Sequence, residues 1–411
     1  MAQAPGAADP DEGAPEASAR ALYAAYGVGL TGNGVAMMLK VIIPLWAIQL
    51  NFTATEIGIA IGLSALLPFL FSIHGGVLMD RLGTRRVTMV YAVTNALMCP
   101  LYPMFPSFAA VVMLQLITGL TSNMVWVGAQ TLIVRFTKGK TTLIARFSVA
   151  ARCGTLSAPV LIGAIWDLAG AWGAFAFVGA AGTLVVVALL MVPGAEEDAP
   201  EGAKPALGDL IPKWRDYTSA FSLIAIPAVA FVVVMSALRI SSSGIQTSFY
   251  VVYLNEIGLS GTLIGVLISV SEGAGLGGAF MAGWWERFIR PHWVFVIFAA
   301  MSIVCVTMTP GLGGIFVLLL LATAGRGYAQ GLSQPVMFGI LSRAVNPALQ
   351  GTAIGLRTTS NRFATVVVPL IMGFVTDAVG IEQSFYVIGG ILMVSCGFVA
   401  LFVKRIPDFR T

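Results

Sequence analysis

The chain has 411 residues, of which 57% are hydrophobic and 10% are charged, with a formal net charge of +4. A soluble domain carries about 25% charged residues, so this composition leaves too few charges for a water-facing surface and argues against a soluble enzyme. The basic residues are not gathered in one tract, which argues against a nucleic-acid partner. We therefore expect lipid to be the solvent for most of the chain.

Twelve stretches are apolar and long enough to cross a bilayer, which takes about 20 residues. They span residues 20–50, 55–79, 87–104, 107–135, 143–166, 172–192, 219–254, 261–285, 292–309, 312–342, 348–376 and 382–403. Lys and Arg occur in alternate loops, and the six loops between them contain neither residue. Under the positive-inside rule, this alternation predicts an inner-membrane protein with both termini in the cytoplasm.

The remaining segments divide the chain into two halves. Residues 1–19 are rich in Ala, Pro and acidic residues and lack a basic n-region, which is typical of a disordered cytoplasmic tail rather than a cleaved signal peptide. We expect six-helix bundles at 20–192 and 219–403, a cytoplasmic linker at 193–218 and a cytoplasmic tail at 404–411. The predicted fold is an all-α polytopic membrane protein with twelve transmembrane helices in two pseudo-symmetric bundles.

The predicted helices five and eleven have identical residue types at several positions that lie 210 residues apart, as Pro159 and Pro369 do. The equivalent pairs are Arg152 and Arg362, Pro159 and Pro369, Gly163 and Gly373, Asp167 and Asp377, and Phe175 and Phe385. Duplicated halves of this kind place a transport site at the interface between them.

The loop after the second stretch has the order G-x-x-x-D-R-x-G-x-R, formed by Gly76, Asp80, Arg81, Gly83 and Arg85. It resembles the signature loop of the major facilitator superfamily, G-x-x-x-D-R-x-G-R-R, except that Thr84 replaces the first closing basic residue. The resemblance covers essentially the whole chain. It implies a secondary active transporter that works by alternating access.

The same resemblance implies a conformational latch on the cytoplasmic side. In the family, the loop aspartate lies near the start of helix eleven, which we place at Asn346 and Pro347. Gly76 is expected to permit close helix approach and Gly83 a tight turn. The predicted latch consists of Gly76, Asp80, Arg81, Gly83 and Arg85, with Arg135 as the salt-bridge partner of Asp80.

A second pattern in helix five, Gly154, Ala158, Pro159 and Gly163, resembles a worn form of the family's antiporter motif. It hints at export. A helix interface built from glycine and proline would have the same pattern, so both interpretations stay open.

Ionisable residues inside a bilayer are costly and mark functional sites. Five cations, Lys40, Arg152, Arg239, Arg326 and Arg362, lie near the middle of the membrane against one carboxylate, Glu272. Arginine grips carboxylate or phosphate in two places, so this surplus favours an anionic substrate. A helix-locking bond to backbone carbonyls is the alternative for any single arginine.

The resemblance places Lys40, Arg239 and Arg326 on the wall of the central cavity. It also sets Arg152 opposite Glu272 across the halves, and it brings His74 near Arg357. We expect these last four residues to serve in proton coupling or gating. Uncharged side chains that could complete the substrate site, or could simply join helices, are Asn33, Gln246, Tyr250, Gln330 and Gln334.

Two functions remain open at this point. The first is transport of a small organic or phosphorylated anion, coupled to protons or to anion exchange. The alternative is a drug or metabolite–proton antiporter of broad specificity. With two histidines and no metal-ligand cluster, Ser-His-Asp set or Walker-type loop, we expect no enzyme, cofactor or metal. The expected partners are a small-molecule substrate, the lipid bilayer, and a proton or counter-anion, and we expect a monomer.

Overall fold

The computed structural model describes residues 19–137, 140–192, 223–346 and 349–403. The predicted linker, the C-terminal tail and all but the last residue of the N-terminal tail lie outside these ranges. Among the described residues, every regular element is a helix.

Seven α-helices form the N-terminal half. They are α1 (Ala19–Gln49), α2 (Ala54–Leu63), α3 (Leu66–Leu82), α4 (Thr84–Met98), α5 (Leu101–Met104), α6 (Phe108–Thr137) and α7 (Thr141–Met191). The C-terminal half opens with the short turn η2 (Leu223–Ala225). Its other elements are α9 (Pro227–Gln246), α10 (Phe249–Glu256), α11 (Gly261–Trp285), α12 (Pro291–Thr307), η3 (Pro310–Leu312), α13 (Phe316–Ala344), α14 (Gln350–Val379) and α15 (Ile381–Val403).

These elements confirm the twelve predicted crossings, although several crossings are not single helices. α7 contains crossings five and six, because its backbone turns at Gly170, where φ is 62°. Such a positive φ is readily adopted only by glycine. In the described part of the chain, eight helical segments are long and apolar enough to span a membrane, and two of them, Ala54–Phe71 and Pro227–Glu256, run across a break between two helices.

Three crossings are broken where the sequence predicted continuous stretches. Crossing two breaks between α2 and α3, and crossing three breaks at Pro100, which has no amide N–H to donate to a helical hydrogen bond. Crossing seven breaks between α9 and α10 at Thr247 and Ser248. The hydroxyl of Ser248 donates to the Gly244 carbonyl at 2.6 Å. Such local bonds compete with the helical ladder.

The predicted start of helix eleven, at Asn346 and Pro347, lies partly outside the described residues, which omit 347 and 348. α14 is described from Gln350, and Leu349 precedes it without a side-chain cap. The Asn346 carbonyl accepts a bond from the Leu349 amide at 2.8 Å.

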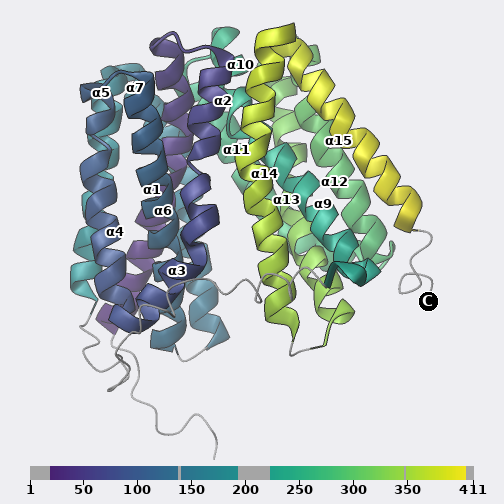
Figure 1. Ribbon diagram of the computed structural model, residues 1–411, viewed down its shortest axis with the longest axis horizontal. Coiled ribbons are helices and arrows are strands. Elements are labelled where there is room, and N and C mark those ends of the chain that lie inside the picture. The colour runs from purple at the N-terminus through teal and green to yellow at the C-terminus, as the bar shows by residue number, and fades with distance from the viewer. Residues whose placement is uncertain (1–18, 138–139, 193–222, 347–348, 404–411) are drawn as a thin grey trace, which may run out of the picture.

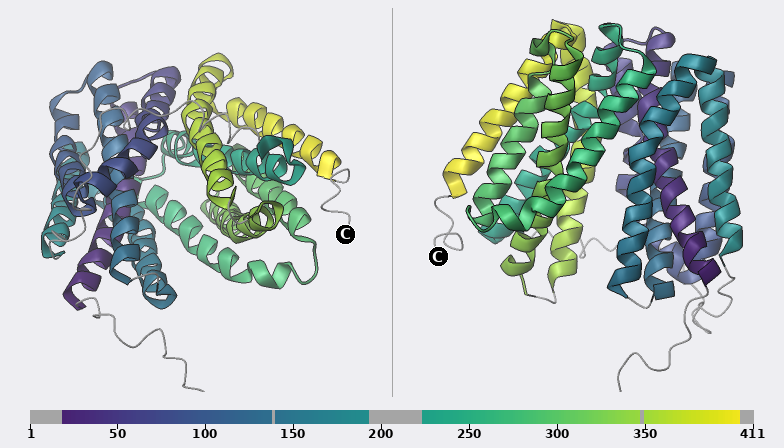
Figure 2. Two further views of the ribbon diagram at one scale, coloured as in Figure 1. Left: turned by 60° about the horizontal axis from the view of Figure 1, so that its bottom comes forward. Right: turned by 180° about the vertical axis from the view of Figure 1, so that it is seen from behind.

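The two halves meet most closely at one end of the molecule (Figures 1 and 2). We call this the distal end, and it contains the turns at residues 50–53, 257–260 and 380. There α2 lies beside α14, and α7 lies beside α11. Figure 1 shows the ribbons of α3 and α14 further apart toward the opposite end.

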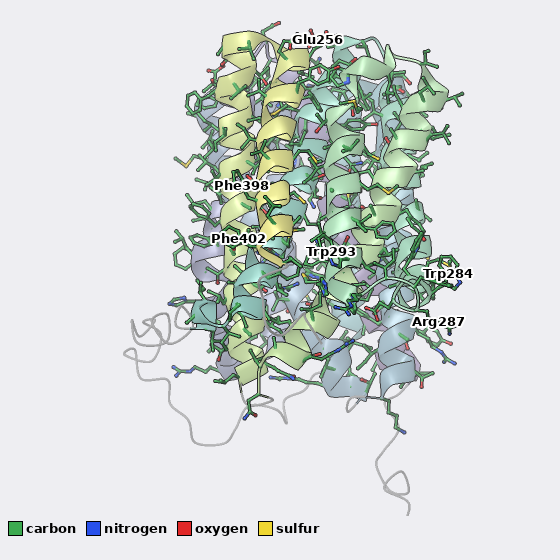
Figure 3. All side chains as sticks on the ribbon, turned by 90° about the vertical axis from the view of Figure 1, so that its right-hand side faces the viewer. Glu256, Trp284, Arg287, Trp293, Phe398 and Phe402 are labelled. Atoms are coloured by element: carbon green, nitrogen blue, oxygen red, sulfur yellow. The ribbon has the colours of Figure 1, made fainter. Side chains whose placement is uncertain are left out.

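The outer surface of the bundle is apolar, as lipid contact requires. Phe398 and Phe402 of α15 are 60% and 61% exposed, and Figure 3 shows them along the outside of that helix. Trp284 and Arg287 lie toward the end away from the distal turns (Figure 3). Tryptophan beside arginine at a helix end is typical of a membrane–water interface.

The internal repeat is visible in the packing of the core. Phe175 and Phe385 occupy equivalent positions, and both side chains are fully buried. Phe175 stacks on Tyr102 with 4.9 Å between ring centroids, whereas Phe385 meets the edge of Tyr253 at 5.8 Å. Each half therefore anchors its last helix by an aromatic pair near the distal end.

Candidate functional site

An ion pair joins the two halves through α7 and α11. Arg152 of α7 places Nη1 3.7 Å from Oε2 of Glu272 on α11, as the sequence predicted. The separation is longer than a hydrogen bond, and the two side chains remain 42% and 26% exposed. The contact is thus a loose ion pair that solvent can reach.

Two further cations surround the same carboxylate. Lys40 of α1 and Arg326 of α13 both lie close enough to Glu272 for their charges to interact with it. The Lys40 side chain is exposed although it sits within an apolar, mostly buried helix. Glu272 therefore neutralises only part of the positive charge in its neighbourhood.

Arg326 is the most deeply enclosed of these cations, with 5% of the residue exposed. Its Nη2 donates to the hydroxyl of Ser271 at 2.7 Å. Its Nε and Nη1 are buried and have no hydrogen-bond partner. A buried donor without a partner costs about 1–3 kcal/mol, so Arg326 has unused capacity for an oxyanion.

Arg239 of α9 is held in place by Gln330 of α13. Its Nη1 donates to Oε1 of Gln330 at 2.7 Å, and Nε of Arg239 is buried without a partner. The Gln330 amide donates to the Arg239 carbonyl and to the Ser302 hydroxyl, both at 2.9 Å. Gln330 is predicted as a substrate ligand, but both ends of its amide already have partners, and its Oε1 orients the Arg239 guanidinium.

Arg362 connects the halves a second time. Its Nη2 donates to Oδ1 of Asn123 on α6. The neighbouring Asn361 accepts a bond from the Ser236 hydroxyl at 2.5 Å. Arg362 also lies within electrostatic reach of Lys40. The sequence did not single out Asn123, and it did not single out Ser271, because a lone polar residue in a membrane helix carries no distinctive signal.

The uncharged candidates are placed differently from one another. Tyr250 is buried and shares a 2.6 Å hydrogen bond with Thr323. Gln246 is also buried, and its Nε2 has no partner. Asn33 is half-buried on α1, and Gln334 is exposed on α13. Gln246 is therefore the neutral side chain with the clearest unused donor.

The predicted approach of His74 to Arg357 stays a prediction, and the contacts described for the two residues are with other neighbours. The His74 ring meets Phe71, with 6.0 Å between centroids. Arg357 lies over the Phe338 ring at 4.6 Å and points Nη1 at the Met337 sulfur at 3.6 Å. Each residue has its own aromatic neighbour.

Only part of the signature loop lies within the described structure. The Asp80 side chain lies outside the described part of the structure, so its pairing with Arg135 stays a prediction. Gly83 has φ of 90°, which fits the predicted tight turn. A Cβ on Gly76 would meet no described atom within 4 Å, so the expected close approach there is wrong for this conformation.

Arg85 has a role that the sequence did not reveal. Its Nε donates to the Leu189 carbonyl at 3.0 Å, and its Nη2 donates to the Leu190 carbonyl at 3.3 Å. These carbonyls end α7, where a cation is favourable. Arg81 lies in the last turn of α3 and Arg135 in the last turn of α6.

The worn antiporter motif lies where helices touch backbone to backbone. A Cβ on Gly154 would come within 2.0 Å of the Leu30 carbonyl oxygen, and one on Gly163 within 2.1 Å of the Gly261 carbonyl oxygen. The pattern thus serves close helix packing, whatever else it does.

Comparison with known proteins agrees with this architecture. The family model described as Major Facilitator Superfamily matches residues 25–285 and again residues 232–410. The chain is 22% identical over 389 residues to the Quinolone resistance protein NorA of Staphylococcus aureus (strain MSSA476), covering 90% of this chain and 93% of that protein.

Solved structures share the fold at low sequence identity. The nucleoside transporter NupG superposes with a TM-score of 0.76 at 14% identity, covering 93% of this chain and 99% of that one. A bacterial homologue of the human lysosomal transporter Spinster, in an inward-facing and occupied conformation, gives 0.74 at 16%, covering 97% and 99%. A POT family transporter in complex with 5-aminolevulinic acid gives 0.71 at 14%, covering 94% and 97%.

Members of the matched family are transporters rather than enzymes. The family model covers both halves, and the duplicated bundles with cations at their interface agree with it. The chain belongs to the Major Facilitator Superfamily and is a membrane transporter.

Proposed function

We propose that this transporter moves a small organic or phosphorylated anion by alternating access, coupled to protons or to exchange for another anion. The observation that carries the proposal is the pair of buried arginines, Arg239 and Arg326. Together they leave three guanidinium nitrogens buried without a partner. The fork of arginine donors matches the oxygens of carboxylate or phosphate.

Electrostatic cost supports the same conclusion. A cation at the centre of a membrane helix costs about 2.5–3.5 kcal/mol on insertion scales. Arg239 and Arg326 lie close enough to repel each other, and their hydrogen-bond partners, Gln330 and Ser271, are neutral. A bound anion would supply the missing charge and satisfy the open donors at once.

Glu272 supplies the proposed coupling. Its carboxylate pairs with Arg152 of the other half. This pair is proposed to break when the halves part or when a substrate anion draws Arg152 away, which would link substrate movement to proton movement. The loose 3.7 Å geometry and the solvent exposure of both side chains fit a pair that breaks and re-forms.

The proposed topology puts both termini in the cytoplasm of an inner membrane. Its support is the alternation of Lys- and Arg-bearing loops with loops that lack both residues. With that topology, the distal end faces the outside. Asp80 and the signature loop then lie on the cytoplasmic side, where we propose that they latch the halves.

The proposal is tested by uptake into proteoliposomes. The purified transporter is offered mono- and dicarboxylates, organophosphates, and neutral and cationic compounds of similar size, with and without an imposed pH gradient. We expect saturable uptake of at least one anion class that weakens in an Arg326→Gln variant. Transport of neutral or cationic compounds alone, unaffected by that change, would refute the proposal.

A drug or metabolite–proton antiporter is the second candidate. The similarity to a quinolone resistance protein over 90% of this chain supports it, as does the worn antiporter motif. Neither observation accounts for the buried arginines. The same uptake assay separates the two candidates. A proton antiporter would transport several structurally unrelated apolar compounds, driven by a proton gradient, with compound and proton moving in opposite directions.

A further inference from the structure

Each half of the transporter uses a carboxylate to cap a helix of the other half at the distal end. Asp167 of α7 accepts the Gly261 amide on Oδ1 and the Thr262 amide on Oδ2, both at 2.8 Å. The Thr262 hydroxyl adds a bond of 2.6 Å to Oδ2. Asp377 of α14 accepts the amides of Ala54 and Thr55 at 3.0 and 2.8 Å, one on each oxygen.

The two contacts are equivalent copies of one another. Asp167 and Asp377 occupy matching positions in the internal repeat, and the amides that they accept belong to the first two residues of α11 and of α2. The first amides of a helix have no partner inside the helix and carry its positive end. A carboxylate that accepts two of them is therefore well placed.

Both helices already have a cap of the ordinary local kind. Thr53 accepts the Glu56 amide in a capping box, and Ser260 accepts the Leu263 amide. These local caps satisfy the third position and leave the first two amides open. In each helix the aspartate from the other half completes the set. The contacts between halves are thus not needed to start α2 or α11, and they act between the halves.

Backbone packing shows how tightly this end is closed. A Cβ on Gly58 would lie 2.4 Å from the Pro369 carbonyl oxygen, and one on Gly265 would lie 2.2 Å from that of Pro159. Pro159 and Pro369 are again equivalent residues of the repeat. Nothing as wide as a substrate can pass between these helix pairs while the contacts hold.

We infer that Asp167 and Asp377 are positioning residues of the transport cycle, two equivalent latches that hold the distal end closed and must open for substrate to cross there. They do for this end what Asp80 is predicted to do at the opposite end. The inference uses the shown transporter function and does not depend on the charge of the substrate or on the orientation in the membrane.

Replacing Asp167 or Asp377 by asparagine removes the charge of the latch and leaves the helix packing unchanged. An asparagine fits the same space, but it has one acceptor oxygen, and its amide group would face the second helix amide. Each Asp→Asn change therefore loses the charge and at least one bond. Since a bond to a charged acceptor is worth about a factor of ten or more in an equilibrium constant, we expect each change to favour the open distal end about tenfold.

The test measures the distance across the distal end. Spin labels are attached at Met104→Cys and Gln383→Cys, exposed positions in opposite halves, after the four native cysteines are replaced by alanine. Double electron–electron resonance is recorded on the full chain in lipid nanodiscs without substrate. We expect Asp167→Asn and Asp377→Asn each to raise the long-distance population about tenfold, and the double variant to raise it further.

Matched variants complete the design. Glu256→Gln removes an exposed carboxylate from the same end (Figure 3) and should leave the distances unchanged. Thr262→Val removes only the hydroxyl donor to Asp167 and should give a smaller shift of about threefold. If the asparagine variants do not yield monodisperse protein, the distances in Thr262→Val decide whether the contact acts as a latch. Unchanged distances in Asp167→Asn and Asp377→Asn, or in Thr262→Val where it decides, would overturn the inference.

Discussion

Arg326→Gln should stabilise the ligand-free protein and weaken binding of the proposed anion. Arg326 is 5% exposed, with one bond to Ser271 and two nitrogens without partners. Each unmet buried donor costs about 1–3 kcal/mol. Glutamine removes the cation and both open guanidinium donors, although it leaves some space unfilled. We therefore expect the ligand-free variant to be about 1–3 kcal/mol more stable than the parent protein.

The same change should weaken binding of the transported anion. A hydrogen bond to a charged group is worth about 1.5–3 kcal/mol, which corresponds to a rise of roughly 10-fold to 150-fold in the apparent KM. Thermal unfolding without substrate and initial uptake rates measure the two effects on one preparation. Arg287→Gln, an exposed arginine at the end of α11 (Figure 3), is the matched control and should change neither. A destabilised variant with an unchanged KM would refute the reasoning.

Three further substitutions test the surrounding residues. Gln330→Ala should raise the KM about tenfold, because Arg239 loses the side chain that orients it; uptake at varied substrate concentration measures this, and an unchanged KM would contradict it. Glu272→Gln should abolish uptake driven by a pH gradient while sparing exchange of substrate across the membrane, whereas a static bridge to Arg152 would lose both or neither. Asp80→Asn should leave expression normal but reduce transport severely, and near-normal uptake would show that the signature loop needs no charge.

Most of the fold could be predicted because lipid imposes a strong length and composition constraint. The count of twelve crossings followed from apolar stretches and from the alternation of basic loops. The breaks at Ser64 and Thr247 could not be predicted in the same way. They depend on local hydroxyl bonds and tertiary packing, which leave hydropathy unchanged.

The charged residues of the site could be predicted from the sequence, but their hydrogen-bond partners could not. Arg152 and Glu272 stood out because an ionisable residue is rare inside a membrane, and the structure brings them together. The contact of Gln330 with Arg239 could not be predicted from the residue type, since an amide in a helix can bind substrate or brace a neighbour equally well. The capping role of Asp167 was hidden for another reason. Its partners are backbone amides, which have no sequence signature.

The helix α11 connects the parts of the transporter that must work together. Ser271 holds Arg326, and the next residue, Glu272, pairs with Arg152 of the other half. The start of the same helix is capped by Asp167. α11 also packs against α13 through Gly275 and Gly331, where an added Cβ on Gly331 would lie 1.8 Å from the Gly275 carbonyl oxygen.

We propose that α11 and α13 move as one body because they pack so closely. Under the proposed function, an anion that repositions Arg326 would then act, through Ser271, on a helix that carries both the central ion pair and the distal contact. Substrate binding and the separation of the halves would be coupled through this one element.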